Sequence, residues 1–283
     1  MALIESRKEK TSRFFVYTIM TALLLFMLLP LMYLVSQAFK PMEELFIFPP
    51  TFYPKRPTLN NFTTLMTALS SYTVPFTRYI FNSVVTTIAP VVTSLFICCL
   101  GAYGLSKYRF PGNNFMYNLI VATLMFPAIA SGLPNYIIVS SMGLTNTFWA
   151  LILPKVGSSF SLFLLKQFVD QIPDTYLEAG RLDGASELLL FRKIIIPLLK
   201  PAMATAVVFS FMGCWGDSYG PMLYLNEEQL KTLPLIVNTI GGAVSRSGAQ
   251  AAAGLLMLLP TIVVFAVMQK RVLNTMMYSG VKG

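Results

Sequence analysis

The residues of this chain that are equipped for chemistry stand inside or at the ends of long apolar runs. Trp215, Asp217 and Tyr219 fall together in the stretch GCWGDSYGPMLYL, which combines flat aromatic rings with hydrogen-bonding groups. That combination suits the recognition of a sugar, because a sugar ring has an apolar face and a rim of hydroxyl groups. Polar residues in such runs usually face a cavity or a neighbouring helix. The other candidates for contact with a solute are Lys155, Ser159 and Asn82.

Each of these candidates also has an ordinary structural interpretation. Tryptophan and tyrosine near the end of an apolar run often anchor a helix at a membrane surface, and serines often serve helix packing. Lys155 allows two hypotheses, because an ammonium group inside a membrane needs a compensating partner. It either pairs with Asp217, the only acid expected within a run, or meets the carboxylate of an acidic sugar such as a uronate.

Several kinds of chemistry are excluded by what the sequence lacks. The chain contains no histidine, which removes histidine-based triads, bases and metal ligands. Its three cysteines, Cys98, Cys99 and Cys214, lie in apolar runs without zinc-site spacing, and we interpret them as small packing residues. No GxxxxGK(S/T) phosphate loop is present, so we expect the chain not to hydrolyse ATP. We therefore assign no catalytic residue, no metal site and no cofactor to this chain.

The elements that position the candidate residues are expected to be membrane-spanning helices. Of the 283 residues, 55% are hydrophobic and only 12% are charged, against about 25% charged in soluble proteins. This composition predicts an all-α integral membrane protein in a lipid bilayer, with a single domain over residues 1–283. Six apolar runs are long enough to cross about 30 Å of hydrocarbon as helices. They cover residues 14–38, 79–104, 115–138, 147–168, 202–222 and 250–270.

The distribution of basic residues predicts the orientation of these helices. Six spans place both termini on the same side of the membrane. That side carries fourteen lysine and arginine residues, including those of the 166–201 segment, and the other side carries six. The positive-inside rule therefore places both termini and this segment in the cytoplasm. The net charge of +9 is then mostly a topology signal, and nucleic-acid binding is not expected.

A charged segment interrupts the apolar runs, where residues 175–201 read TYLEAGRLDGASELLLFRKIIIPLLKP. Pro173 and Asp174 predict the start of a short helix, because proline stops the preceding structure and aspartate caps free backbone amides. Gly184 predicts a break, since glycine adopts backbone angles that other residues resist. A second helix is expected after this break.

The second helix of the charged segment should be capped by Asp183 or Ser186 and should end at Pro197 and Pro201, before the fifth span. Most of its positions between 188 and 196 are apolar, which is too many for a freely solvated loop. One face must therefore pack on lipid headgroups, on the protein's own helices or on a partner.

The spacing within this segment resembles the EAA loop of ABC importer permeases. That pattern reads Glu-Ala-Ala, three residues, glycine, nine residues, isoleucine, one residue, Leu-Pro. Glycine replaces the second alanine here and isoleucine replaces the leucine. The run around DGAS, the YRFPG motif and the terminal SGVKG resemble the sugar-transporting branch and its shorter permease subunits, over roughly residues 15–283. The matching residues are Glu178, Ala179, Gly184, Ile194 and Pro197, and the two departures are Gly180 and Ile196.

The resemblance implies a type I ABC importer permease fold with a cytoplasmic coupling helix in the 170–200 loop, between the fourth and fifth spans. It implies that Glu178 meets a basic residue of an ATPase and that Gly184 allows the sharp turn. The residues that it assigns to ATPase coupling are Glu178, Ala179, Gly180, Asp183, Gly184, Ile194 and Pro197.

The resemblance also implies partners and a mechanism. The partners are a second, non-identical permease subunit, a cytoplasmic ATPase dimer that binds ATP and magnesium, and an extracytoplasmic solute-binding protein. Closure of the ATPase pair would rock the two permeases between inward-open and outward-open forms and so move a sugar or oligosaccharide. The expected location is the inner membrane of a bacterial or archaeal cell.

Other functions remain open on the sequence. If the chain does not belong to the sugar-transporting branch that it resembles, the importer would carry another solute, such as glycerol phosphate or a modified sugar. An ion-driven secondary transporter is a further alternative, although such proteins commonly show inverted repeats and intramembrane acids, and no repeat is visible. A membrane enzyme would need a cluster of catalytic groups on one side, and the sequence offers none.

Overall fold

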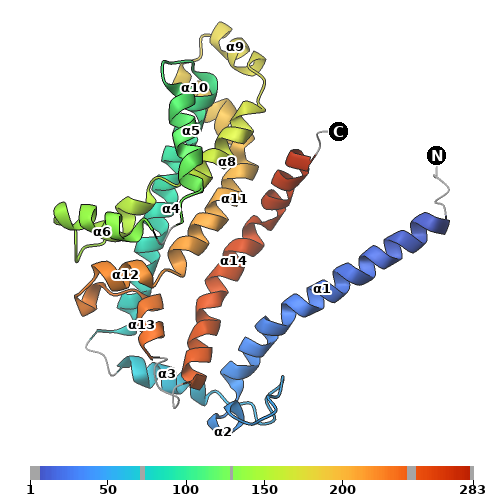
Figure 1. The fold of residues 1–283 in the computed structure, drawn as a ribbon, viewed down its shortest axis with the longest axis vertical. Helices are drawn as coiled ribbons and strands as arrows, with labels where there is room; N and C mark the ends of the chain where they lie inside the picture. Colours follow the sequence, from blue (N-terminus) through green and yellow to red (C-terminus); the bar gives the residue numbers. More distant parts are fainter. Residues whose placement is uncertain (1–6, 71–73, 128–129, 241–246, 281–283) are drawn as a thin grey trace. The chain divides into compact units, whose positions relative to one another are not determined.

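The computed structural model describes residues 7–70, 74–127, 130–240 and 247–280, and every regular element in these ranges is helical (Figure 1). This confirms the all-α prediction. Residues 281–283 of the SGVKG tail lie outside the described residues. Five helical stretches are long and apolar enough to cross a membrane. They are Arg13–Phe39, Phe76–Lys107, Trp149–Asp170, Glu187–Trp215 and Ser247–Leu273.

The chain divides into two compact units, and the prediction of a single domain stays a prediction. The first unit comprises Met1–Ser71 and Thr239–Leu256, and the second comprises Tyr72–Asn238 and Met257–Gly283. The first unit contains the following helices: α1 (Arg7–Phe39), α2 (Met42–Leu45), α3 (Asn60–Ser70) and the start of α14 (Ser247–Gly280).

Within the first unit, Asn61 of α3 fastens the end of α1. Its amide nitrogen Nδ2 donates to the carbonyl oxygen of Ala38 at 2.9 Å and to that of Lys40 at 2.7 Å. These bonds satisfy carbonyl groups that the last turn of a helix leaves without an internal partner. Gly248 of α14 lies against the same amide, because a Cβ there would come within 2.2 Å of Asn61 Oδ1. Glycine is therefore needed for α14 to begin against α3.

The second unit is built around α4 (Phe76–Lys107), which packs against α8 (Ser159–Asp170) and α11 (Ile196–Trp215) (Figure 1). Cys98 and Cys99 of α4 lie in this shared core and are each only 1% exposed. Both thiols are unpaired. Their interpretation as packing residues is confirmed, because they let three helices approach closely.

One end of α4 holds the loop that contains η3 (Glu228–Leu230) and leads into α13 (Leu233–Ile240). The amide nitrogen of Asn82 donates to the carbonyl oxygens of Gln229 and Lys231, at 2.8 Å each. The hydroxyl oxygen of Ser83 accepts a hydrogen bond from the backbone N–H of Leu233 at 2.8 Å. The loop is therefore anchored to buried side chains of α4.

The predicted third span over 115–138 is wrong as a single helix. The structure contains α5 (Asn113–Leu124) and α6 (Gly132–Ser141) in its place. Pro127 follows the end of α5, and proline both lacks a backbone N–H donor and clashes with the preceding helical turn. Neither helix reaches the length of a membrane span, so five spans are found among the described residues where six were predicted.

The fourth and fifth spans also differ from their predicted forms. The fourth consists of α7 (Trp149–Ile152), η1 (Leu153–Lys155) and α8, with residues 156–158 between η1 and α8 in no regular helix. Pro154 and Gly157 account for this interruption, since neither favours a helix interior. The fifth, predicted over 202–222, begins earlier and ends at Trp215, and α12 (Tyr219–Tyr224) follows as a separate helix.

Candidate functional site

A left-handed turn at Gly184 separates the two helices of the charged segment, α9 (Thr175–Leu182) and α10 (Glu187–Leu190). The φ angle of Gly184 is +79°. The N–H of Ala185 donates to the carbonyl of Gly180, and the N–H of Gly184 donates to the carbonyl of Arg181, both at 3.0 Å. This pair of bonds is the Schellman arrangement, which ends a helix and requires a residue that tolerates positive φ. The predicted break at Gly184 is confirmed.

The second helix of the segment does not stop at the prolines. It begins with α10, capped by the Ser186 hydroxyl, and continues through the π-helical turn η2 (Phe191–Ile195) into α11. The prediction that Pro197 and Pro201 end it is therefore wrong. A π turn bonds each carbonyl to the N–H five residues later and is wider than an α turn. It ends two residues before Pro197 and leaves room for a residue that cannot donate to the preceding turn.

The start of α9 is where the sequence predicts it, but Asp174 does not cap the helix with its side chain. Its carboxylate pairs instead with the ammonium group of Lys107, at the end of α4, at 2.7 Å. The hydrogen bond and the charge of Lys107 lower the pKa of the Asp174 carboxyl below its usual value. Asp174 therefore stays ionised at neutral pH and ties the entrance of α9 to α4.

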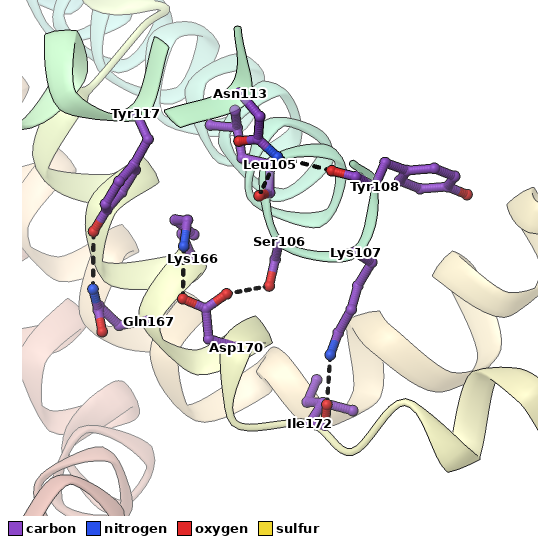
Figure 2. A network of polar contacts seen from close by, with 10 residues as sticks. All are labelled: Leu105, Ser106, Lys107, Tyr108, Asn113, Tyr117, Lys166, Gln167, Asp170 and Ile172. Atoms are coloured by element: carbon purple, nitrogen blue, oxygen red, sulfur yellow. Dashed lines mark hydrogen bonds and ion pairs between the residues drawn. The ribbon is translucent and has the colours of Figure 1, made fainter. Parts of the chain in front are cut away.

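Figure 2 shows that the end of α4 is joined to the end of α8 by several further polar contacts. The ammonium group of Lys107 also donates to the carbonyl oxygen of Ile172 at 2.6 Å. Asp170 accepts hydrogen bonds from Ser106 of α4 and, at 2.7 Å, from Lys166. The chain that enters the charged segment is thus fixed to the last turn of α4 before α9 begins.

The chain that leaves α9 is fixed to the same end of α4, through Glu187. The hydroxyl of Tyr103 donates to Glu187 Oε2 at 2.8 Å, and the hydroxyl of Tyr108 donates to the same oxygen. Arg181 of α9 donates from Nε to Glu187 Oε1 at 2.8 Å. Glu187 was not among the residues predicted from the sequence, because the two tyrosines lie far from it along the chain and no spacing rule links them.

The charged segment buries one side and exposes another. Leu177, Leu190 and Ile195 are at most 1% exposed and belong to the core around α4. Ile194 is half-buried against the same core, whereas Glu178, Ala179 and Asp183 are exposed. Large apolar side chains are exposed as well, at Tyr176, Leu182 and Leu188. Figure 1 places α9, which carries Tyr176 and Leu182, at one end of the second unit.

Gly180 sits where α9 approaches α10 most closely. A Cβ at this position would lie 2.4 Å from Leu190 Cδ2. The position holds alanine in the EAA pattern, so the glycine is matched to the large buried leucine that faces it. Gly180 therefore has a packing role within the segment, and its assignment to ATPase coupling stays a prediction.

Replacing Gly180 with alanine is expected to destabilise the protein, because the added methyl group would displace the side chain of Leu190, which is only 1% exposed in the core. Overpacking of this kind costs about 1–3 kcal/mol. Thermal unfolding of the purified variant should show the loss, and adding Leu190→Val should recover part of it by removing the Cδ2 atom. Gly104→Ala is the matched control, since nothing lies within 4 Å of a Cβ there. Equal thermal stability of Gly180→Ala and the parent would contradict this account.

A second polar site lies where the fourth and fifth spans are interrupted. The ammonium group of Lys155, at the end of η1, pairs with Asp217 Oδ2 at 2.6 Å, and the two side chains are 29% and 18% exposed. Asp217 Oδ1 accepts the backbone N–H of Gly220 at 3.0 Å. The predicted ion pair is therefore confirmed. The pair links the interruption that follows η1 in the fourth span to the interruption between α11 and α12.

The ion pair borders a small polar cavity. Its lining includes Lys155, Trp215 and Asp217 together with Thr87 and Thr232. The hydroxyl oxygens of both threonines are buried without a hydrogen-bond partner among the described residues. The space amounts to about 10 Å³, which is the room that one water molecule occupies. This small cavity therefore has no room for a sugar ring. Lys155 also borders a second, larger pocket of about 390 Å³, whose lining includes Ser158 and Phe209.

Of the other candidate residues, Trp215 borders this cavity, and Asn82, Ser159 and Tyr219 are not in its lining. The indole N–H of Trp215 is bonded to the carbonyl of Met257 at 2.9 Å, so only its ring borders the cavity. Asn82 anchors the loop described above. Ser159 accepts a hydrogen bond from Thr123 of α5 at 2.7 Å, and Tyr219 is 65% exposed. The structure thus brings together Lys155, Asp217 and Trp215 and separates the remaining three.

Comparison with known proteins gives consistent matches along the chain. The family model described as binding-protein-dependent transport system inner membrane component matches residues 94–274. Protein LplC of Bacillus subtilis is 30% identical over 276 residues, covering 90% of each chain. The arabinooligosaccharides transport system permease protein AraQ of Halalkalibacterium halodurans is 30% identical over 257 residues, covering 90% of this chain and 91% of AraQ.

One solved structure has the same fold. It is the crystal structure of a bacterial ABC transporter involved in the import of the acidic polysaccharide alginate. The matching chain has a TM-score of 0.78 and 24% sequence identity, and the match covers 95% of this chain and 99% of that one. At this sequence identity, the similarity shows a shared fold and does not identify the solute.

Proposed function

The chain belongs to the family of binding-protein-dependent transport system inner membrane components, and from this premise we propose that it is one of two permease subunits of an ATP-driven importer of sugars or oligosaccharides. Membership makes it a membrane-embedded transport subunit. ATP and magnesium would be bound by a separate ATPase, which agrees with the missing phosphate loop in this sequence.

The observation that carries the proposal is the structure of the charged segment. It exposes Tyr176, Leu182 and Leu188 at one end of the second unit while both of its connections are bonded to α4. An exposed apolar surface on a rigidly held short helix suits docking into a groove of another protein. We propose that this protein is a cytoplasmic ATPase and that Glu178, which is exposed on α9, meets one of its basic residues.

The proposed mechanism is alternating access. Closure of the ATPase dimer would displace α9, and the attached helices would rock against those of a second, non-identical permease subunit. The type I arrangement with six spans requires α5 and α6 to act together as the interrupted third span. Interrupted helices are tolerated in a membrane where they line a cavity or pack within protein.

The proposed location is the inner membrane, with both termini in the cytoplasm. The excess of lysine and arginine on the side of the termini supports this orientation. An extracytoplasmic solute-binding protein would then deliver the solute to the opposite face, where the 223–248 loop lies in this topology.

The proposed solute class rests on a relative. AraQ is named as an arabinooligosaccharides permease, which supports a sugar or oligosaccharide for this chain. The ion pair with Asp217 favours a structural role for Lys155 over contact with a sugar carboxylate, because Asp217 neutralises its ammonium group. Lys155 and Asp217 are therefore proposed as a structural pair beside the path.

Reconstitution is expected to separate this function from its alternatives. The chain purified alone should show no ATP hydrolysis, and proteoliposomes with the second permease, the ATPase and the binding protein should take up sugar only when ATP is present. The measurement is radiolabelled oligosaccharide uptake with and without ATP. Uptake driven by an ion gradient without the ATPase would instead indicate a secondary transporter.

A further inference from the structure

We propose that Glu187 is the positioning residue that makes α9, α10 and α4 move as one body. This inference rests on the proposed function, because it concerns how a displacement of α9 reaches the membrane-spanning helices. Glu187 is among the nine residues that the EAA pattern leaves unspecified, and its role follows from the contacts of its carboxylate.

Donors from separate elements converge on the carboxylate of Glu187. Tyr103 lies within α4, Tyr108 lies just beyond its end, and Arg181 lies in the last turn of α9. Tyr103 and Tyr108 donate to Oε2, whereas Arg181 donates from Nε to Oε1 and from Nη2 to Oε2 at 3.4 Å. Bonds of this kind to a charged acceptor are about twice as strong as bonds between neutral groups.

Glu187 is not needed for the ordinary task of a residue at a helix start. Ser186 already caps α10, because its hydroxyl oxygen accepts the N–H of Leu189 at 3.4 Å. The Tyr103 ring is only 5% exposed and packs against Phe191 with ring centroids 5.6 Å apart. The hydroxyl that binds Glu187 is thus held by the core and gives the carboxylate a fixed position.

The two attachments of the charged segment lie on either side of α9. Lys107 holds the chain just before α9, through Ile172 and Asp174, and Glu187 holds it just after the Gly184 turn. The groups that hold the segment at both attachments belong to the last two turns of α4 or to Tyr108, the residue that follows α4. With Glu187 removed, α9 could pivot about its entrance, and its displacement would no longer reach α4 in full.

The test uses the assembled complex with its ATPase and binding protein in proteoliposomes. Glu187→Ala should leave the amount of assembled complex and the rate of ATP hydrolysis near the parent values. Uptake per ATP hydrolysed should fall by at least about fivefold, the lower end of typical coupling between sites. The Tyr103→Phe/Tyr108→Phe variant should lower the same ratio, and adding Glu187→Ala to it should cause little further loss. Glu227→Ala is the matched control, since its carboxylate binds Asn146 away from the charged segment.

A second readout does not depend on transport. Spin labels at Leu182→Cys and Arg109→Cys, both exposed positions, report the distance between α9 and the end of α4 in the full chain in nanodiscs. Glu187→Ala should broaden the distance distribution, and Glu187→Asp should narrow it again. An unchanged distribution would overturn the proposal even if the importer function stands. Broadening with unchanged uptake per ATP would overturn it too, as would loss of assembled complex with normal uptake per ATP in the remainder.

Discussion

Replacing Gly184 with valine is expected to lower ATP-dependent uptake by about tenfold or more while the protein still inserts into the membrane. The φ angle of +79° places this residue in the left-handed region, where a side chain costs about 1–2 kcal/mol and a β-branched one is a clear outlier. The Schellman bonds that orient α9 against α10 depend on this angle. Valine should therefore open the turn and misplace the apolar surface of α9.

The control for this prediction is a second glycine with a positive φ angle, outside the charged segment. Gly143 has a φ angle of +68° after α6, and no atom lies within 4 Å of the position that a Cβ would take there. Gly143→Val should therefore lose similar backbone stability but keep its uptake. Gly184→Asn should retain much of the activity, because asparagine tolerates the left-handed region better than valine. Equal uptake by Gly184→Val and the parent would remove the turn from the mechanism.

Replacing Lys155 with methionine is expected to lower the yield of folded, assembled protein several-fold. The substitution leaves the Asp217 carboxylate without its ion-pair partner. Removing one partner of a fully buried ion pair typically costs about 3–5 kcal/mol, and the loss should be smaller for this partly exposed pair. Size-exclusion profiles of the detergent-extracted complex measure the effect directly. Lys231→Met is the control, since its pair with Glu228 is exposed to a similar degree but lies in a loop outside the spans. Assembly within the membrane should therefore depend less on it.

The ion-pair account is tested most sharply by a compensating substitution. Asp217→Asn removes the charge but keeps an oxygen that accepts the N–H of Gly220. The double variant Lys155→Met/Asp217→Asn should assemble normally, whereas each single variant should assemble poorly. Normal assembly of Lys155→Met together with lost uptake of an acidic oligosaccharide would instead assign Lys155 to the solute.

The elements that could be predicted from the sequence are those with local causes. Long apolar runs predict α1, α4 and α14 because length and composition alone define a span. The Gly184 turn follows from a residue type with distinctive backbone freedom. The Lys155–Asp217 pair could be anticipated as well, since few groups compensate an ammonium in an apolar run.

What the sequence did not predict depends on contacts between distant residues. The continuation of α10 through η2 and Pro197 into α11 contradicts the local rule that prolines end helices, because a wider turn accommodates the ring. Asp174 leaves its capping role because Lys107, 67 residues away, offers a charged partner. Asn82 has the chemistry to bind a solute, but the loop carbonyls of Gln229 and Lys231 already occupy its amide.

The attachments of α4 at both of its ends have a consequence for long-range communication. The helix has 32 residues, which corresponds to about 48 Å and to the full thickness of a membrane with its headgroups. Near one end, Asn82 and Ser83 form hydrogen bonds to a loop. Near the other end, Lys107 and Tyr103 are bonded to the charged segment and its entrance. In the proposed orientation, the loop lies outside the cell and the charged segment lies in the cytoplasm. A shift or tilt of the loop would then be transmitted along α4 to the charged segment before any solute has entered the membrane.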